Sequence, residues 1–128
     1  MQNRSVLQLP EARATGYLRA NLLLLLGEKP SHGYGLLDRL PYLGVDGVDP
    51  GGLYRCLRSL EDDGLVWSSW EAGERAGPRR VYQLTEDGAE QLRTCAQAAT
   101  DNYRQLRRYI SRYRKVAFTS VSSSRRSG

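Results

Sequence analysis

The sequence predicts a mainly α-helical fold with one small β-hairpin, arranged as a winged helix-turn-helix that continues into a long C-terminal helix. Three observations predict it. Residues 49–64 have helical apolar periodicity between clear start and stop signals. Residues 65–84 change to strand-like alternation around a glycine-containing turn. From residue 89 onwards, apolar or small residues recur at alternating three- and four-residue steps, which is typical of a long packed helix.

Bulk properties narrow the function classes. The 128 residues correspond to one domain with a modest core. A formal charge of +5 and a pI near 9.5 favour an anionic partner. Cys56 and Cys95 are far apart on predicted helices, which argues against a disulfide framework or a zinc ribbon. There is no signal-peptide pattern, and Leu22–Leu26 is too short to cross a bilayer, so we expect a soluble cytoplasmic protein without a membrane partner.

The first third of the chain supplies an arm and two helices. Residues 1–14 are expected to form an N-terminal arm, and residues 15–84 the winged-helix domain. A helix over residues 15–28, with Thr15 as its N-cap, contains a leucine run that is apolar all round. That run must therefore face two sides of its own core or a second subunit. Ser31 is expected to cap a supporting helix over residues 32–40, which Pro41 should stop or kink.

The next helix carries the residues expected to read DNA. Asp49 can cap it and Pro50 suits its first position. Gly64 ends it, and one face is predicted to be buried, namely Leu53, Cys56, Leu57 and Leu60. The other face begins with small residues and can approach a major groove; its DNA-binding candidates are Gly51, Gly52, Arg55, Arg58 and Ser59. Tyr54, in the first turn, is a further DNA-binding candidate that could be a core aromatic, a phosphate ligand through its hydroxyl, or both. Arg55 is the residue expected to contact a base edge.

A hairpin, or wing, follows the reading helix. Val66, Ser68 and Trp70 alternate with Trp67 and Ser69. Both tryptophans are interpreted as sheet and core residues. Glycines and a proline mark the turn, and three arginines around it are expected to contact phosphates or the minor groove, namely Arg75, Arg79 and Arg80.

Residues 85–116 are expected to form a dimerisation helix. Thr85 can cap it, and a coiled-coil seam follows, made of Leu92, Ala96, Ala99, Tyr103, Leu106, Ile110 and Tyr113. A symmetric homodimer would bury this seam. Basic residues surround its C-terminal end, namely Arg104, Arg107, Arg108, Arg112, Arg114 and Lys115; they are interpreted as a solvated face, with a phosphate or anionic-effector site as the alternative. The Ser-rich residues 117–128 are expected to be a disordered tail.

Four short motifs, in a fixed order along the chain, resemble those of a known family. His32-Gly33-Tyr34, Pro50-Gly-x-Leu-Tyr54, Leu57-x-x-Leu-Glu-x-x-Gly-Leu65 and Gly77-Pro-Arg-Arg-x-Tyr-x-Leu-Thr-x-x-Gly88 resemble the PadR family of bacterial transcriptional regulators over about residues 22–92. The chain departs from that pattern at Gly52, where the family usually has Thr or Ser, at Arg55, where it often has Pro, and at Pro41, which interrupts a helix that is normally continuous. The first two lie on the reading face, so they bear on the operator sequence and leave the fold expectation intact.

The resemblance implies a homodimeric, DNA-binding transcriptional repressor that binds a palindromic operator in double-stranded DNA and is released by a small molecule. In some relatives an aromatic effector binds between the dimerisation helices, and here the corresponding residues are Tyr103, Arg107, Tyr109 and Tyr113; an anionic effector would also suit them. His32 is expected to pack and hydrogen-bond at a helix N-terminus, and the alternative is a phosphate contact, so His32 and Tyr34 are secondary DNA-contact candidates.

Rival interpretations are an enzyme and a protein-interaction module. The one histidine, His32, has no Cys, Asp or Glu cluster at ligand spacing, so no metal or other cofactor is expected. A hydrolase that pairs His32 with Cys56 or Cys95 lacks an orienting third group, so the protein is not expected to be an enzyme. The alternative that stays open is a winged-helix module that docks a protein, for which weak, salt-insensitive DNA binding would be the sign.

Overall fold

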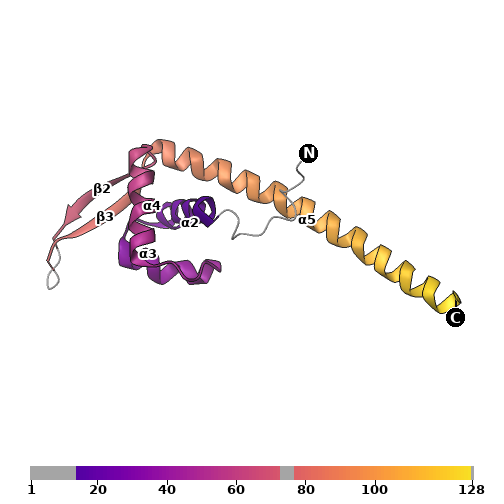
Figure 1. Cartoon of the computed structure of the whole chain (residues 1–128). Helices are drawn as coiled ribbons and strands as arrows, with labels where there is room; N and C mark the ends of the chain where they lie inside the picture. The colour runs from indigo at the N-terminus through magenta and orange to yellow at the C-terminus, as the bar shows by residue number, and fades with distance from the viewer. Residues whose placement is uncertain (1–13, 73–76, 128) are drawn as a thin grey trace. The chain divides into compact units, whose positions relative to one another are not determined.

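The computed structural model describes residues 14–72 and 77–127, with side chains described for residues 17–72 and 77–118. The chain forms two compact units that divide after Cys95, within its last helix. The first unit is a winged helix. Its elements are α2 (Ala14–Glu28), β1 (Ser31–His32), α3 (Gly33–Arg39), the 3-10 helix η2 (Leu40–Leu43), α4 (Pro50–Asp62), β2 (Val66–Glu71), β3 (Arg79–Leu84) and the start of α5 (Glu86–Ser127) (Figure 1).

Helix starts follow side-chain chemistry. Asp49 accepts a hydrogen bond from the Gly52 amide at 3.1 Å and Pro50 occupies the first position of α4, which confirms the predicted start. The predicted cap of α3 is wrong by one residue: His32, and not Ser31, accepts from the Gly35 amide. The Ser31 hydroxyl instead donates to the carbonyl of His32 at 2.9 Å. As expected, the helix before Pro41 stops, and the chain tightens into η2.

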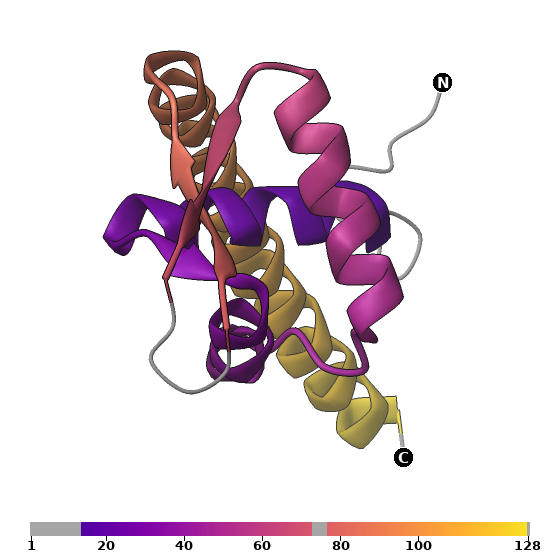
Figure 2. The ribbon, with the colours of Figure 1, turned by 90° about the vertical axis from the view of Figure 1, so that its left-hand side faces the viewer.

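The wing is part of a three-stranded antiparallel sheet with the order β1-β3-β2. β2 and β3 form the predicted hairpin, with Ser68 opposite Tyr82. The two-residue strand β1 adds to the other edge of β3, with His32 opposite Val81, and the sequence pattern did not reveal it. Figure 2 shows the hairpin at the front, with α4 beside it and α2 passing behind.

Helices α2, α3 and α4 enclose the core together with the inner ends of the strands. Leu22, Leu23, Leu25 and Leu26 are buried, whereas Leu24 is 38% exposed, so the leucine run is covered mainly by its own unit. All four residues predicted for the inner face of α4 are buried. Leu92 of α5 packs against the same core, which leaves Ala96 as the first residue of the predicted seam outside the winged-helix unit.

Helix α5 starts as predicted and ends later than predicted. The Thr85 hydroxyl accepts from the Gly88 amide at 3.0 Å, and Glu86 and Asp87 occupy the first turn. Its helical residues extend to Ser127, where a disordered tail from residue 117 was expected. No glycine or proline lies between Ala89 and Ser127, so the sequence contains no residue that stops helix propagation.

Candidate nucleic-acid interface

The exposed surface of α4 has two flanks on either side of its buried stripe. Tyr54, Arg58 and Glu61 follow one another at helical steps on the flank toward the sheet. Gly52, Arg55 and Ser59 form the flank toward α2. The predicted reading residues are therefore divided between two environments.

On the sheet-side flank, α4 is tied to α3 and to the wing. The Tyr54 ring and hydroxyl occupy the position where a Cβ on Gly33 would lie, so only glycine permits this contact. The Ser68 hydroxyl donates to Glu61 Oε2 at 2.8 Å. Tyr54 is consequently a packing residue with a partly exposed edge, and Arg58 is the exposed cation of this flank.

Arg80 extends this arrangement along the wing. Its Nε donates to the Ser68 hydroxyl at 2.8 Å, and its guanidinium lies 5.3 Å from the centroid of the Trp70 ring. A continuous chain of contacts thus runs from Trp70 through Arg80 and Ser68 to Glu61 of α4. The wing cation is held at a fixed place relative to the reading helix.

Residues of the wing and of α4 surround the side chain of Tyr82. Burial raises the pKa of the Tyr82 hydroxyl, and the Arg80 guanidinium, with a further contribution from Arg58, opposes that rise. Glu61 and Tyr54 act in the same direction as burial. The two arginines therefore lie near one buried tyrosine, on the side where the wing meets α4.

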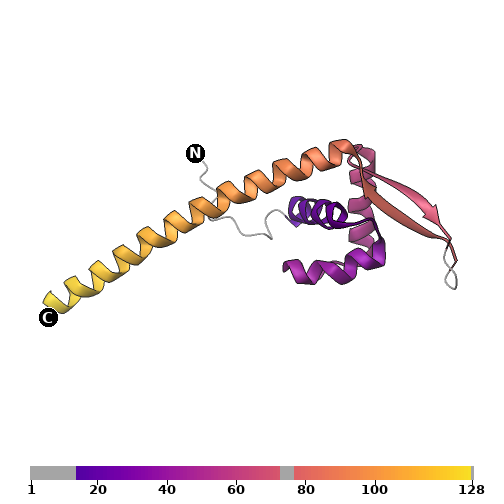
Figure 3. The ribbon, with the colours of Figure 1, turned by 180° about the vertical axis from the view of Figure 1, so that it is seen from behind.

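The tryptophans of the wing are exposed, contrary to their predicted place in the core. Trp67 is 46% exposed and Trp70 is 66% exposed. The reason is the length of the hairpin, whose outer part extends away from the three helices and has no second layer over it (Figure 3). Trp70 covers Arg80 and does not fill a core.

The α2-side flank carries Arg55 and Ser59. Ser59 accepts a hydrogen bond from Arg19 Nη1 at 2.7 Å, and Arg19 Nη2 pairs with Asp63 at 2.8 Å. Ser59 thus joins α4 to α2, and sequence reasoning missed Arg19 because it lies 40 residues away. This partner makes Ser59 a weaker candidate for DNA contact than Arg55.

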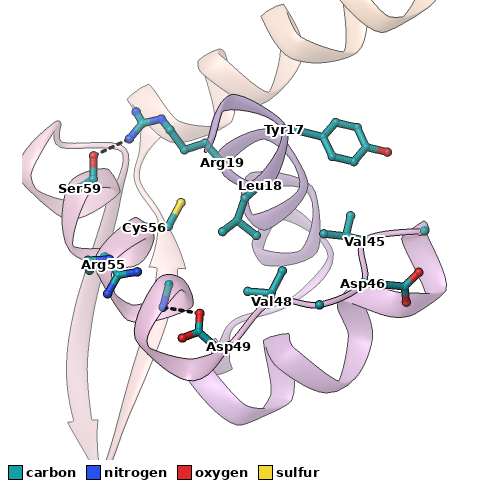
Figure 4. Close-up of a pocket in the computed structure, with 13 residues that line it drawn as sticks. Tyr17, Leu18, Arg19, Val45, Asp46, Val48, Asp49, Arg55, Cys56 and Ser59 are labelled. Atoms are coloured by element: carbon teal, nitrogen blue, oxygen red, sulfur yellow. Dashed lines mark hydrogen bonds between the residues drawn. The ribbon is translucent and has the colours of Figure 1, made fainter. Parts of the chain in front are cut away.

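Arg55 lies against the first turn of its own helix. A Cβ on Gly51 would lie 3.4 Å from Arg55 Nη1, and one on Gly52 would lie 3.8 Å from Nη2. The two small residues therefore leave room for the guanidinium beside the helix N-terminus. Figure 4 shows Arg55 and Asp49 on one side of a pocket of about 630 Å³, with Arg19 and Leu18 of α2 across from them and Val45 and Val48 on the connecting loop.

Arg79 and Arg80 are adjacent in sequence and point to opposite faces of the sheet. Arg79 Nη1 lies 3.2 Å from Nε2 of His32, which follows from the register of β1 and β3. Tyr34, beside His32, is 63% exposed. The third wing candidate, Arg75, lies outside the described residues.

The second unit exposes apolar side chains along α5. Tyr103 is 60% exposed, Ile110 46%, Tyr113 61% and Phe118 75%. The four effector-site candidates form two pairs. Arg107 lies 5.8 Å from the centroid of the Tyr103 ring, while Tyr109 and Tyr113 line a hollow of about 340 Å³ with Arg112 and Val116.

Two other features, a metal site and a membrane span, are absent from the described ranges. No group of three or more His, Cys, Asp or Glu residues there is placed to hold a metal ion. None of the described helices has the length and apolar character needed to cross a membrane.

Comparisons with known proteins agree with this architecture. The model of the transcriptional regulator PadR-like family matches residues 22–94. A solved protein of unknown function, described as a potential transcriptional factor, is 33% identical with a TM-score of 0.69, and the match covers 79% of this chain and 90% of that one. A PadR family regulator from Clostridium difficile R20291 is 20% identical with a TM-score of 0.67, and the match covers 73% of this chain and 98% of that one. PadR of Bacillus subtilis, solved with operator DNA, is 22% identical with a TM-score of 0.56, and the match covers 62% of this chain and 46% of that one. A comparison with curated proteins gave no match.

Proposed function

The chain belongs to the transcriptional regulator PadR-like family, and on that premise we propose that it is a repressor that binds a palindromic operator as a homodimer and is released by a small molecule. The single observation that carries DNA binding is the chain of contacts from Arg80 through Ser68 to Glu61. It fixes a wing cation relative to the reading helix, so that backbone contacts and base contacts are made in one register. The complex of Bacillus subtilis PadR with operator DNA is the precedent for this use of the fold.

Selectivity is assigned to α4 and general affinity to the wing. Arg55 and Arg58 are exposed on the reading helix, and Arg55 lies beside a first turn without bulky side chains. An arginine at such a helix end can form a bidentate contact with guanine in the major groove. Phosphate contacts are assigned to Arg79 and Arg80 of the wing, one on each face of β3.

Homodimerisation is supported by the apolar side chains that the second unit leaves exposed. The exposed side chains of Tyr103, Ile110 and Tyr113 lie at positions of the predicted seam. A second copy of the same helix would cover them, and the two-fold symmetry of such a dimer matches a palindromic operator.

Ligand response is assigned to the same seam. The angle between two paired helices would fix the separation of the two reading helices, and a ligand that binds one arrangement better would shift the dimer toward it. The hollow beside Tyr109 and Tyr113, with Arg112 at its edge, suits an aromatic or anionic compound. An inter-subunit disulfide that locks the seam should abolish the ligand response and leave DNA binding in place; a locked dimer that responds normally would refute this mechanism.

Fluorescence anisotropy tests DNA binding directly. The protein is titrated with duplex from the upstream region of its own gene and with a scrambled duplex, each over a range of salt. Arg55→Ala should remove most of the preference for the upstream duplex, whereas Arg80→Ala should weaken both complexes equally and reduce the slope of log affinity against log salt by about 1. Repression, as opposed to activation, requires that deletion of the gene raise transcription from that upstream region.

A protein-docking role is the second candidate, and the exposed Trp67 and Trp70 favour it. Exposed aromatic residues on a projecting hairpin are typical of protein contacts. Weak binding to both duplexes, unaffected by Arg55→Ala and insensitive to salt, would support this role over DNA recognition.

A further inference from the structure

Two N–H donors lie at hydrogen-bond distance from the two ring nitrogens of His32, and a neutral imidazole ring can accept only one hydrogen bond. The Gly35 amide points at Nδ1 from 3.2 Å, and Arg79 Nη1 points at Nε2 from 3.2 Å. Both are N–H donors. A neutral imidazole has one lone pair for an acceptor, because its other nitrogen carries a hydrogen. One of the two contacts must therefore bring two N–H groups together.

The contact with the Gly35 amide determines which ring nitrogen of His32 carries the hydrogen. The Gly35 amide is a first-turn N–H of α3, and His32 Nδ1 is its only acceptor among the described residues. Leaving that part-buried donor unpaired would cost more than leaving an exposed guanidinium N–H to water. Nδ1 is consequently the acceptor, and the hydrogen of the ring lies on Nε2.

On the exposed side of His32, the Nε2–H and Arg79 Nη1–H then meet without an acceptor between them. Glu71 lies opposite Arg79 in the register of β2 and β3, but neither residue takes part in an ion pair within the described part of the chain. The β1–β3 pairing holds His32 and Arg79 on one face of the sheet. Once the Arg79 N–H turns away from Nε2, two neighbouring donors at this separation suit two oxygens of one phosphate, or one oxygen shared between them.

We propose that His32 and Arg79 form a two-donor clamp for a single backbone phosphate of the bound DNA. This inference rests on the proposed function and deepens it. His32 supplies a neutral hydrogen bond whose direction is set by the cap of α3, and Arg79 supplies the charge. Arg80, on the opposite face of β3, does not belong to the clamp.

The variant that tests the clamp is His32→Asn. Asparagine is a preferred N-cap and can still accept from the Gly35 amide, but its side chain is too short to present a donor beside Arg79. We expect an unchanged melting temperature and roughly tenfold weaker binding to both upstream and scrambled duplex, since a phosphate contact is read regardless of sequence. His32→Ala serves as the contrast, because it removes the cap as well and should also lower the melting temperature.

A double-mutant cycle asks whether the two residues act on one phosphate. In the Arg79→Ala background, His32→Asn should weaken binding by less than about threefold, because the shared ligand is already lost. In the Arg80→Ala background it should cost the same factor as in the unmodified protein. Independent effects of His32 and Arg79 would overturn the clamp even if selective DNA binding is confirmed. Conversely, an intact cycle on scrambled duplex would support the clamp even if no preferred operator is found.

The ring can be observed alone, because His32 is the only histidine in the chain. Long-range proton–nitrogen NMR spectra should show the Nε2–H tautomer in the free protein, with the Nε2–H proton protected from exchange when either duplex is added. An Nδ1–H tautomer in the complex would overturn the proposal. Inorganic phosphate, compared with chloride at equal ionic strength, separates the two sources of phosphate: a change with free phosphate and none with duplex would overturn DNA as the ligand.

Discussion

The winged-helix unit and the second unit of α5 use similar apolar residues in opposite ways. In the first, Leu22, Leu36, Leu53 and Leu57 are fully buried. In the second, Ile110 is 46% exposed and Tyr113 is 61% exposed, although they recur with helical regularity. The difference teaches that the first unit completes its own core, whereas the second unit leaves an apolar stripe exposed, which the proposed dimer would bury.

The largest effect should come from a charge in that stripe. Ile110→Glu is expected to convert the dimer to monomers, because an unpaired carboxylate would be buried at the seam. Loss of the second reading helix should weaken operator binding by roughly 100-fold or more. Sedimentation velocity and anisotropy measure the two effects, with Gln105→Glu, which lies off the seam on the same helix, as the control. A dimer that survives Ile110→Glu would show that the stripe is not the interface.

A core truncation should affect the winged-helix unit in a different way. Leu57→Ala is expected to lower the free energy of unfolding by about 2–5 kcal/mol, since it leaves a cavity among fully buried leucines. Leu24→Ala removes the same atoms from the exposed member of the leucine run and should cost well under half as much. Urea unfolding compares them, and equal losses would contradict the burial described for α2.

The contact between α3 and the reading helix gives a smaller, local effect. Gly33→Ala places a methyl group where the Tyr54 side chain lies, and should cost about 1–3 kcal/mol of stability. The double variant Gly33→Ala/Tyr54→Leu should recover part of that loss, because leucine has no atoms at the hydroxyl end. Thermal unfolding measures both; failure of the second change to compensate would place the strain elsewhere.

The smallest effect concerns alkaline pH. Burial raises the pKa of the Cys56 thiol above its ordinary value of 9.0, with Arg19 opposing the rise, and burial also raises that of Tyr82 above 10.0. Both groups are neutral at low pH, so their contribution is fully present below the unfolded values and is lost as the pH rises through the folded ones. Stability should therefore decline above about pH 9. Cys56→Ala should reduce the first part of that decline when urea unfolding is measured against pH.

The sequence predicted the elements with strong local signals and missed those that depend on distant partners. Asp49 and Pro50 set the start of α4 through contacts within four residues, so the prediction could be made without the fold. Strand β1 is two residues long and exists only because β3 lies beside it. The Arg19–Ser59 bond and the exposure of Trp67 likewise depend on how elements pack.

The wing arginines of the candidate site also depend on contacts that the sequence could not predict. Their sequence predicted phosphate contact for Arg75, Arg79 and Arg80 as one cluster. The structure places Arg79 beside His32 and Arg80 beside Trp70, on opposite faces of β3. Alternation along a strand predicts that adjacent residues diverge, but which face meets α4 is set by the buried Tyr82 and Val66.

Hydroxyl-radical footprinting on the upstream DNA of the protein's own gene tests the central claim most directly, since it reports DNA recognition and dimer symmetry together. We predict two protected half-sites related by two-fold symmetry, with centres about one helical turn or a multiple of it apart. Protection of one asymmetric site, or none at concentrations that saturate the anisotropy signal, would contradict a homodimer that reads a palindromic operator through α4.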